Sequence, residues 1–183
     1  MKVAIIGYSG SGKSTLAIKL GDIYKCPVLH LDKVHFVENW IERDDETARV
    51  LVKEFMDNND SWVTDGNYTN LLREQRLKEA DMIVFMCYSR LKCLYQAYNR
   101  YKTYKGKTRE SMADNCSEKF DFEFIKWIII DGRSREKKKQ YVETIRKYNQ
   151  KFVLLRNKKE TASFLKRIQE GVRFKIIIRQ NSV

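Results

Sequence analysis

The stretch from Gly7 to Thr15, GYSGSGKST, combines glycines, a lysine and hydroxyl side chains in a spacing that can bind phosphate. It fits the pattern G-x-x-x-x-G-K-[ST], directly after the apolar run VAII and directly before the helical pattern STLAIKLGDIY. Glycines allow consecutive backbone N–H groups to converge on phosphate oxygens, and the helix that follows presents about half a positive charge. The residues expected to contact the phosphates are Gly7, Ser9, Gly10, Ser11, Gly12, Lys13, Ser14 and Thr15.

Such a loop supports phosphoryl transfer from a nucleotide. Lys13 adds a full positive charge on a mobile side chain, and the hydroxyl of Ser14 is expected to bind Mg²⁺, which bridges the terminal phosphates. A chance match to the whole pattern is expected in fewer than roughly 1 in 100 chains of this length and ordinary composition. We therefore expect ATP and Mg²⁺ as cofactors, and a purely structural glycine-rich turn is the alternative.

Two aspartates follow apolar runs of strand length, where an acceptor site beside the loop would need them. Asp32 lies in HLDKVHF and Asp65 in VTDGNY. Ligands bind at the carboxyl ends of parallel strands, so both carboxylates are expected near the phosphates. Asp32 is expected to accept the proton of an acceptor hydroxyl or to hold a magnesium-bound water, and Asp65 to orient water on Mg²⁺. A turn or a helix cap is the alternative role for each aspartate.

Arginines in the second half of the chain are candidates for contacts to the transferring phosphoryl group. Arg100 and Arg109 flank the basic stretch YKTYKGKT, and a mobile flap from about Arg100 to Lys119 is expected to close over the phosphates and exclude water. Arg76 is expected on the helix after DGNY, close to the acceptor. Solvated surface charge is the alternative for each arginine.

Strand-like apolar runs alternate with amphipathic segments along the chain, which is typical of β-α-β units and a parallel sheet. We expect a three-layer α/β fold with a single domain over residues 1–170 and a lid at about 100–120. The expected strands are Lys2–Gly7, Pro27–Leu31, Ser61–Gly66, Asp81–Tyr88 and Lys151–Arg156.

Two helices of this fold have readable sequence signals. A long helix is expected from Asp121 to about Lys147, with a kink or interruption at Asp131 and Gly132. The helix before the third strand is expected to bury one face, made by Thr47, Val50, Leu51 and Phe55.

The C-terminal residues 171–183, GVRFKIIIRQNSV, form a tail after the last expected helix. Phe174 to Ile178 can form an extra edge strand, a partner-binding arm or an unstructured tail, and the sequence leaves these alternatives open.

The 183-residue chain has 36 lysines and arginines against 24 acidic residues, which gives a net charge of +12. The excess lies mainly after Arg90, so the second half is expected to face anions such as nucleic acid, a membrane surface or nucleotides. The four cysteines lack CxxC pairing and histidines at metal spacing, so we expect reduced thiols. No apolar run approaches the roughly 20 residues that span a bilayer and no signal peptide is evident, so we expect a cytoplasmic protein without membrane contact.

Several of these segments resemble the DNA topology modulation proteins, the FlaR-related group of P-loop proteins. The resemblance rests on GYSGSGKSTLA, LHLDKVHF, WVTDGNY and above all KTRESMADNCSEKFDFEFIKWI, and it covers the chain to about Leu165. This group is similar to adenylate kinase and other small nucleoside or nucleotide kinases. The resemblance implies a five-stranded parallel sheet of order 2-3-1-4-5, with a lid after the fourth strand.

The same resemblance implies roles for individual residues. ATP phosphates would bind the loop from Gly7 to Thr15, and the loop RNKK would lie against adenine, so Arg156 and Asn157 become candidate nucleotide contacts. The lid side would carry Arg100, Arg109, Arg133 and Arg135. The acceptor pocket would be formed by Asp32, His35, Asp65, Asn67 and Tyr68, with Arg76 as a further candidate.

The chain departs from true adenylate kinases at the acceptor side. In those enzymes the DG after the third strand runs into a proline and an arginine, whereas this chain has Asn67 and Tyr68 there, which argues against AMP as the acceptor. LDKVHF is similar to the segment of uridine kinase in which an aspartate faces a substrate hydroxyl. No helix-turn-helix, zinc finger or other DNA-reading motif is present in the sequence.

Three functions follow from these patterns. The favoured one is an ATP-dependent kinase that phosphorylates a small molecule such as a nucleoside, a nucleotide or a similar metabolite. The expected lid and basic rim are compatible with an anionic acceptor. The second is a nucleic-acid-binding ATPase, suggested by the charge of +12 and the name of the FlaR-related group. The third is a nucleotide-binding regulator without turnover. One sequence does not identify the acceptor or the oligomeric state.

Overall fold

The sheet of the protein has five parallel strands in the order β2-β3-β1-β4-β5, as predicted. The structure is a computed structural model that describes residues 1–109 and 111–171. Each strand lies inside its predicted range, and the possible extra strand at 174–178 lies outside the described residues. The strands are β1 (Lys2–Gly7), β2 (Val28–His30), β3 (Trp62–Asp65), β4 (Met82–Met86) and β5 (Phe152–Leu155).

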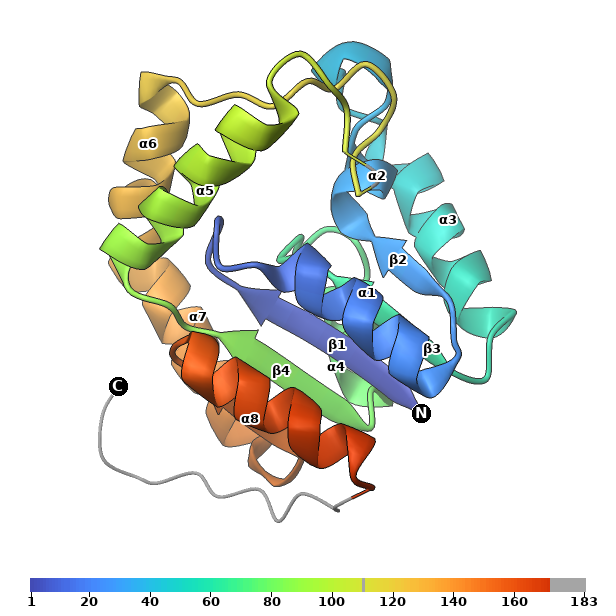
Figure 1. Cartoon of the computed structure of the whole chain (residues 1–183). Coiled ribbons are helices and arrows are strands. Elements are labelled where there is room, and N and C mark those ends of the chain that lie inside the picture. The colour runs from blue at the N-terminus through green and yellow to red at the C-terminus, as the bar shows by residue number, and fades with distance from the viewer. Residues whose placement is uncertain (110, 172–183) are drawn as a thin grey trace.

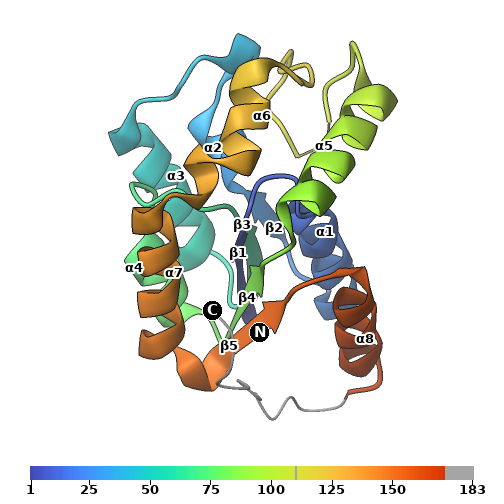
Figure 2. The same cartoon turned by 90° about the vertical axis from the view of Figure 1, so that its left-hand side faces the viewer.

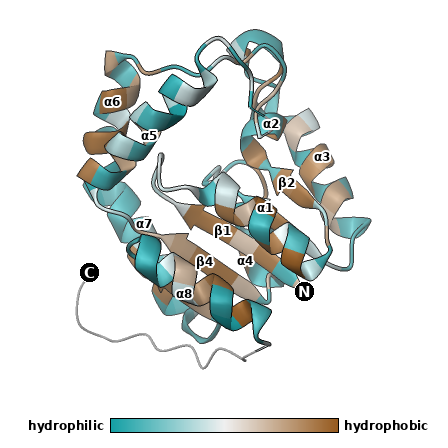
Figure 3. Ribbon diagram, in the orientation of Figure 1, coloured by the Kyte–Doolittle hydropathy of each residue, from teal (hydrophilic) through white to brown (hydrophobic). Residues whose placement is uncertain are grey.

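The central strands are buried on both faces, which is why their sequences read as continuous apolar runs. In β1, Val3, Ala4, Ile5 and Ile6 are at most 1% exposed, and β4 is buried along its whole length. Figure 3 shows these strands as the hydrophobic centre of the fold, with hydrophilic residues on the outer helices. Burial of these runs is the main free energy that holds the sheet together.

Helices cover both faces of the sheet and make three layers (Figures 1 and 2). On one face lie α1 (Lys13–Tyr24) and α8 (Lys158–Gln169). On the other face lie α3 (Asp45–Asp57), α4 (Arg73–Glu79) and α7 (Arg135–Lys147). Within the described residues no helix is long and apolar enough to cross a membrane.

Helix α3 buries a different face from the one predicted. Its buried residues are Ala48, Val52 and Met56, whereas Val50 is 49% exposed and Leu51 is 37% exposed. The prediction was wrong: the buried face is shifted by about one residue along the sequence from the predicted face. The reason is that apolar residues lie on two neighbouring stripes of this helix. Packing against the core selected the stripe that begins with the small Ala48.

The segment after β4 rises above the sheet and returns. It consists of α5 (Arg90–Tyr104), loop residues 105–109 and 111–121, and α6 (Phe122–Ile129). The 3-10 turn η2 (Asp131–Arg133) separates α6 from α7, so the predicted helix from Asp121 is interrupted at the predicted place. A Cβ at Gly132 would lie 2.7 Å from the carbonyl oxygen of Trp127, so this tight turn needs a glycine.

Three short elements complete the described chain. Helix α2 (Leu31–His35) continues directly from β2, and η1 (Glu38–Trp40) follows it. The 3-10 turn η3 (Asn149–Lys151) leads into β5. Because α2 begins where β2 ends, Asp32 is held at the carboxyl edge of the sheet, beside the loop that follows β1.

Candidate active site

The loop between β1 and α1 has the backbone that its glycines predict. Gly7 has a φ of +148° and Gly12 a φ of +93°, both in the region that L-residues rarely adopt. A Cβ on Gly7 would lie 2.5 Å from the carbonyl oxygen of Met86, so the loop packs tightly against β4 there. At Gly12 the nearest heavy atom to an added Cβ is 4.0 Å away, so the loop is open on that side.

The donors of this loop fit an anionic ligand. The hydroxyl of Ser11 is buried and has no hydrogen-bond partner among residues 1–109 and 111–171. Gly12 precedes α1 and, in the part of the chain that the structure describes, no side chain caps this helix. Buried polar groups are normally satisfied, and a helix N-terminus attracts negative charge. The loop from Gly7 to Thr15 therefore fits the phosphates of a nucleotide.

Lys13 lies between the loop and two carboxylates. Its Nζ donates to the carbonyl oxygen of Tyr8 over 3.2 Å. Burial lowers the pKa of Lys13, and the nearby carboxylates of Asp32 and Asp65 oppose this shift. The lysine is thus a poorly hydrated cation close to both strand-end aspartates, which favours binding of a further anion.

Asp65 joins the loop to the end of β3. Its Oδ2 accepts a hydrogen bond of 2.8 Å from the hydroxyl of Ser14, and its Oδ1 contacts Nδ1 of His30 at the end of β2. Magnesium is held by few protein oxygens together with substrate phosphates, so a hydroxyl beside a carboxylate fits it. The described residues contain no group of three or more His, Cys, Asp or Glu side chains around one point.

Asp32 and Tyr68 face each other across the predicted acceptor side. The Tyr68 hydroxyl donates to Oδ1 of Asp32 over 2.8 Å, and burial, followed by the charge of Asp32, raises the pKa of Tyr68. The Tyr68 ring lies 4.5 Å from the ring of His35, centroid to centroid. Nδ1 of His35 is buried and has no hydrogen-bond partner within the described residues. These three side chains lie together, and their contact with an acceptor stays a prediction.

Asn67 binds the loop itself. Its Oδ1 accepts from the backbone N–H of Gly7 over 2.9 Å, and its Nδ2 donates to the carbonyl oxygen of Gly7 over 2.5 Å. Both ends of the Asn67 amide are therefore used on the backbone of one glycine. The structure gives Asn67 a positioning role beside the acceptor role predicted for it.

The structure does not place Arg76 at the surface of the site. Arg76 is fully buried; its Nε donates to the carbonyl oxygen of Leu71 and its Nη2 to that of Tyr68, each over 2.8 Å. Burial lowers the pKa of this guanidinium. Arg76 thus holds the backbone that carries Tyr68, and the predicted direct contact with an acceptor does not agree with this burial.

Arg100 and Arg109 meet on one carboxylate. Nε of Arg100 lies 2.8 Å from Oε2 of Glu118, and Nε of Arg109 contacts Oε1 of the same side chain. Burial lowers the pKa of Arg100, Arg109 lowers it further, and the charges of Glu118 and Asp32 oppose these effects. Glu118 was not among the residues predicted for the site, and the sequence marks it only as an acidic residue in a mostly basic lid.

The loop that carries Glu118 is docked on the segment after α2. Cys116 accepts from the N–H of Trp40 over 3.2 Å and donates to the carbonyl oxygen of Val37 over 3.4 Å. The indole Nε1 of Trp40 donates to the carbonyl oxygen of Ser117 over 3.2 Å. Figure 1 shows this loop crossing from α5 towards α2 above the sheet. The predicted flap is thus packed against the segment after α2 in this structure, and its closure over the phosphates and its mobility stay predictions.

The remaining predicted residues lie around the site. Asn157 caps α8 by accepting from the N–H of Glu160 over 2.9 Å, and the N–H of Arg156 donates to Glu160 Oε2 over 2.8 Å. Their contact with adenine stays a prediction. Arg133 is buried, with its guanidinium 3.6 Å from the ring centroid of Tyr8, and it donates to the carbonyl oxygen of Tyr88.

Two contacts to the loop were not predicted from the sequence. Nε1 of Trp127 in α6 donates to the hydroxyl of Ser9 over 3.0 Å. Nε2 of Gln96 in α5 donates to the carbonyl oxygen of Gly10 over 2.7 Å. The two helices above the sheet therefore contact the loop between β1 and α1 directly, which no local sequence pattern indicates.

Comparison with known proteins places this geometry in a known fold. No family model and no curated protein matches the sequence. A shikimate kinase from Acinetobacter baumannii in complex with shikimate has a TM-score of 0.56 and 12% identity, and the match covers 93% of this chain and 92% of that chain. The fold is that of the P-loop kinases.

Two further structures share this kinase-like fold. A shikimate kinase from Bacteroides thetaiotaomicron has a TM-score of 0.50 and 14% identity, over 95% of this chain and 99% of that chain. An uncharacterized protein from Eubacterium ventriosum ATCC 27560 has a TM-score of 0.50 and 15% identity, over 94% and 98%. At such identities the likeness is one of fold.

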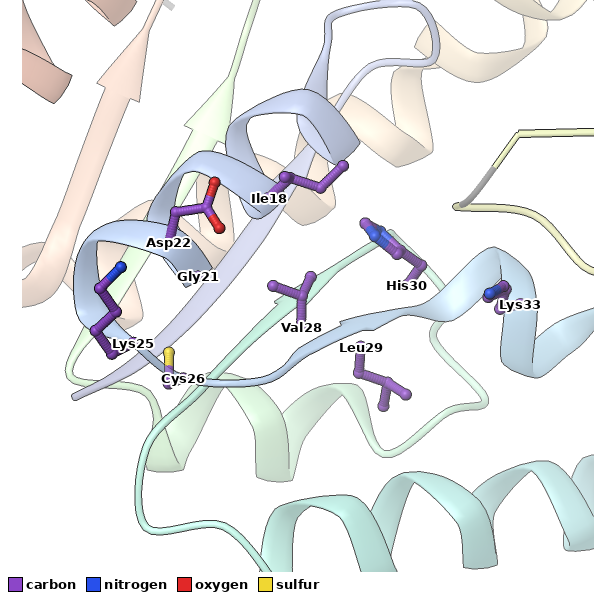
Figure 4. A pocket seen from close by; sticks show the side chains of 9 residues that line it. All are labelled: Ile18, Gly21, Asp22, Lys25, Cys26, Val28, Leu29, His30 and Lys33. Atoms are coloured by element: carbon purple, nitrogen blue, oxygen red, sulfur yellow. The ribbon is translucent and has the colours of Figure 1, made fainter.

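A separate hollow of about 650 Å³ lies beside β2 and does not contain the loop (Figure 4). It is formed by the second half of α1 and the edge strand, and His30 is the one lining residue that also contacts the candidate site, through Asp65. Its lining residues are Ile18, Gly21, Asp22, Lys25, Cys26, Val28, Leu29, His30 and Lys33. In the kinase-like fold, ligands bind at the carboxyl ends of the strands, so the loop and not this hollow marks the candidate active site.

Proposed function

We propose that the protein is an ATP-dependent kinase that transfers the γ-phosphoryl group of ATP to a small-molecule acceptor, with residues 1–170 as the catalytic unit. The observation that carries this proposal is the meeting of the loop with two strand-end aspartates. Ser14 is hydrogen-bonded to Asp65, and the carboxylates of Asp32 and Asp65 both raise the pKa of Lys13. The kinase-like fold and the resemblance to the FlaR-related group support the same activity.

Each part of the site then has a role. The loop from Gly7 to Thr15 and Lys13 hold the phosphates, and Ser14 with Asp65 holds Mg²⁺, which when bound neutralises charge on the phosphates. Asp32 takes the proton of the acceptor hydroxyl as its oxygen forms a bond to the γ-phosphorus and the bond to the leaving ADP oxygen breaks. Arg100 and Arg109 were expected to stabilise negative charge on the transferring group, but in the structure both are paired with Glu118.

The acceptor side is defined by aromatic and polar groups. Tyr68 orients Asp32 through the hydrogen bond of 2.8 Å, and the ring of His35 packs beside the ring of Tyr68. In this proposal the loop that carries Glu118 closes over the site and limits the entry of water, which would otherwise hydrolyse ATP. A site closed in this way would favour a small acceptor over duplex DNA.

The test is phosphoryl transfer from radiolabelled ATP to a panel of nucleosides, nucleotides and hydroxylated metabolites, with duplex DNA in a parallel reaction. Lys13→Ala and Asp32→Asn are the test variants, and Lys19→Ala is the control because Lys19 is an exposed lysine of the same helix as Lys13. We expect a labelled product that Lys19→Ala retains, and a loss of rate by a factor of about 10² to 10⁴ in Asp32→Asn.

Other outcomes would contradict the proposal. ATP hydrolysis that rises only when DNA is present would replace it with a DNA-dependent ATPase. ATP binding without any labelled product would replace it with a nucleotide-binding regulator. A product whose rate is the same in Lys13→Ala and wild type would show that the loop does not take part.

A further inference from the structure

The two arginines of the lid are already bound to a carboxylate of the chain. Glu118 is buried, with 3% of its side chain exposed, and its two oxygens contact Arg100 and Arg109 separately. Proteins commonly use arginine side chains to bind a carboxylate or a phosphate. Here Glu118 already pairs with both guanidinium groups, so an anionic group that reached them would have to compete with it.

Glu118 is fixed by the residues directly before it. Cys116 and Ser117 each accept a hydrogen bond from Trp40, and the side chain of Asn115 donates a hydrogen bond to Glu38. These contacts fix the loop beside Glu118, so moving the loop away from the arginines would break them. Moving it would also leave a buried charge without its partners, which is strongly unfavourable.

The other charged groups on the acceptor side do not replace this pair. Arg76 is buried on backbone carbonyls, and Nε of Arg43 donates to the carbonyl oxygen of Val34 over 2.8 Å. Asp32 adds a negative charge that faces Tyr68. Lys13 belongs to the phosphate-binding loop, so its charge is used by the nucleotide.

We infer that the acceptor is a neutral, hydroxylated molecule such as a nucleoside or a polyol, and that Glu118 excludes acceptors bearing a carboxylate or a phosphate. The inference rests on the proposed kinase function and names its substrate class. An anionic acceptor would have to compete with a fixed internal carboxylate for Arg100 and Arg109, and would meet the charge of Asp32 as well. A neutral acceptor offers its hydroxyl to Asp32 without either penalty.

The inference is tested with matched pairs of acceptors at saturating ATP and Mg²⁺. Each pair is a neutral molecule and its monophosphate, for example a nucleoside with its 5′-monophosphate, and a polyol with its monophosphate. For the wild type we expect kcat/KM to be at least about tenfold higher for the neutral member. This comparison needs no variant, so it holds even where a substitution impairs folding.

Glu118→Gln keeps the shape of the side chain and removes its charge. We expect it to reduce the preference for the neutral member by about tenfold, through a lower KM for the monophosphate. Glu123→Gln, an exposed position in the first turn of α6, is the matched control and should keep the wild-type preference.

The outcomes separate the inference from the proposed function. A wild-type preference for monophosphates, or a preference that Glu118→Gln leaves unchanged, would overturn the inference and leave a kinase. A lack of transfer to every acceptor in the panel would contradict the kinase function itself.

Discussion

The hydroxyl of Ser14 donates a hydrogen bond of 2.8 Å to Oδ2 of Asp65, and this contact joins the start of α1 to the end of β3. The two residues come from separate β-α units of the sheet, and the parallel register that pairs Ile5 with Asp65 brings them together. The other oxygen of Asp65 contacts His30 at the end of β2. One carboxylate thus connects three neighbouring elements at the edge where the nucleotide is expected.

Replacing Asp65 with Asn tests its role towards Mg²⁺. The amide keeps the size of the side chain and loses the charge, so we expect the Mg²⁺ concentration for half-maximal transfer to rise by about tenfold or more. The measurement is the transfer rate as a function of Mg²⁺. Asp60→Asn, at an exposed position before β3, is the control. An unchanged Mg²⁺ dependence in a folded Asp65→Asn protein would remove Asp65 from the metal site.

Gly12→Ala tests the open side of the loop. Gly106→Ala is its matched control. Both glycines have a positive φ, +93° for Gly12 and +70° for Gly106, and an added Cβ would meet no atom closer than 4.0 Å at either position. Each substitution therefore carries a similar backbone strain of about 1 kcal/mol. We expect weaker binding of a non-hydrolysable ATP analogue, measured by calorimetry, for Gly12→Ala alone. Equal affinities in the two variants would show that the phosphates do not approach Gly12.

The lowered pKa of Lys13 predicts that ATP binding is coupled to the uptake of protons. Burial lowers the pKa of Lys13 in the free protein, and the negative phosphates raise it again in the complex. Binding therefore takes up protons at pH values between the lowered pKa of Lys13 in the free protein and its higher pKa in the complex. Calorimetry over a series of pH values below 10.5, in buffers of different ionisation enthalpy, measures this uptake, which should be absent in Lys13→Ala. An uptake independent of Lys13 would contradict the assignment.

The same pKa shift fixes the sign of a stability effect. Between the lowered pKa of Lys13 and the ordinary value of 10.5, the unfolded chain binds more protons than the folded chain. The contribution of Lys13 to the free energy of unfolding therefore rises with pH across that window, and it is constant below the lowered pKa. Urea unfolding of wild type and Lys13→Ala over this pH range checks the sign.

Asn67→Asp tests the clamp on Gly7. The substitution removes the NH₂ donor and places a carboxylate against the carbonyl oxygen of Gly7, to which Nδ2 of Asn67 donates. We expect a loss of about 2 kcal/mol in the free energy of unfolding in urea, and weaker ATP binding as well. Asn149→Asp, at an exposed position, serves as the control. Unchanged stability would mean that the contact with Gly7 contributes little.

The sheet and the backbone of the loop between β1 and α1 were predictable because their signals are local. Each strand is an apolar run of the right length, and the spacing of Gly7, Gly12, Lys13 and Ser14 lies within a single segment. The strand order was implied by the resemblance and is confirmed. The buried face of α3 was predicted wrongly, because two apolar stripes compete there and contacts with distant strands decide between them.

Several polar side chains could not be assigned from the sequence. Arg76 and Arg133 are basic residues near the site, yet both are buried and donate to backbone carbonyls. Glu118 acts through arginines 18 and 9 positions away in the chain, a pairing that depends on how the lid folds back. Whether such a residue faces a ligand or the protein is a property of long-range packing, which residue type and spacing do not encode.

The hydrogen bond between Trp127 and Ser9 gives the protein an optical signal of its own. The chain has three tryptophans: Trp62 is fully buried in the core, Trp40 contacts the lid, and Trp127 touches the phosphate-binding loop. Indole emission responds to its hydrogen bonds and to nearby charge, so a nucleotide on the loop should change the fluorescence of Trp127 first. Titrations of Trp40→Phe and Trp127→Phe would then follow loop occupancy and lid docking separately, without any attached dye.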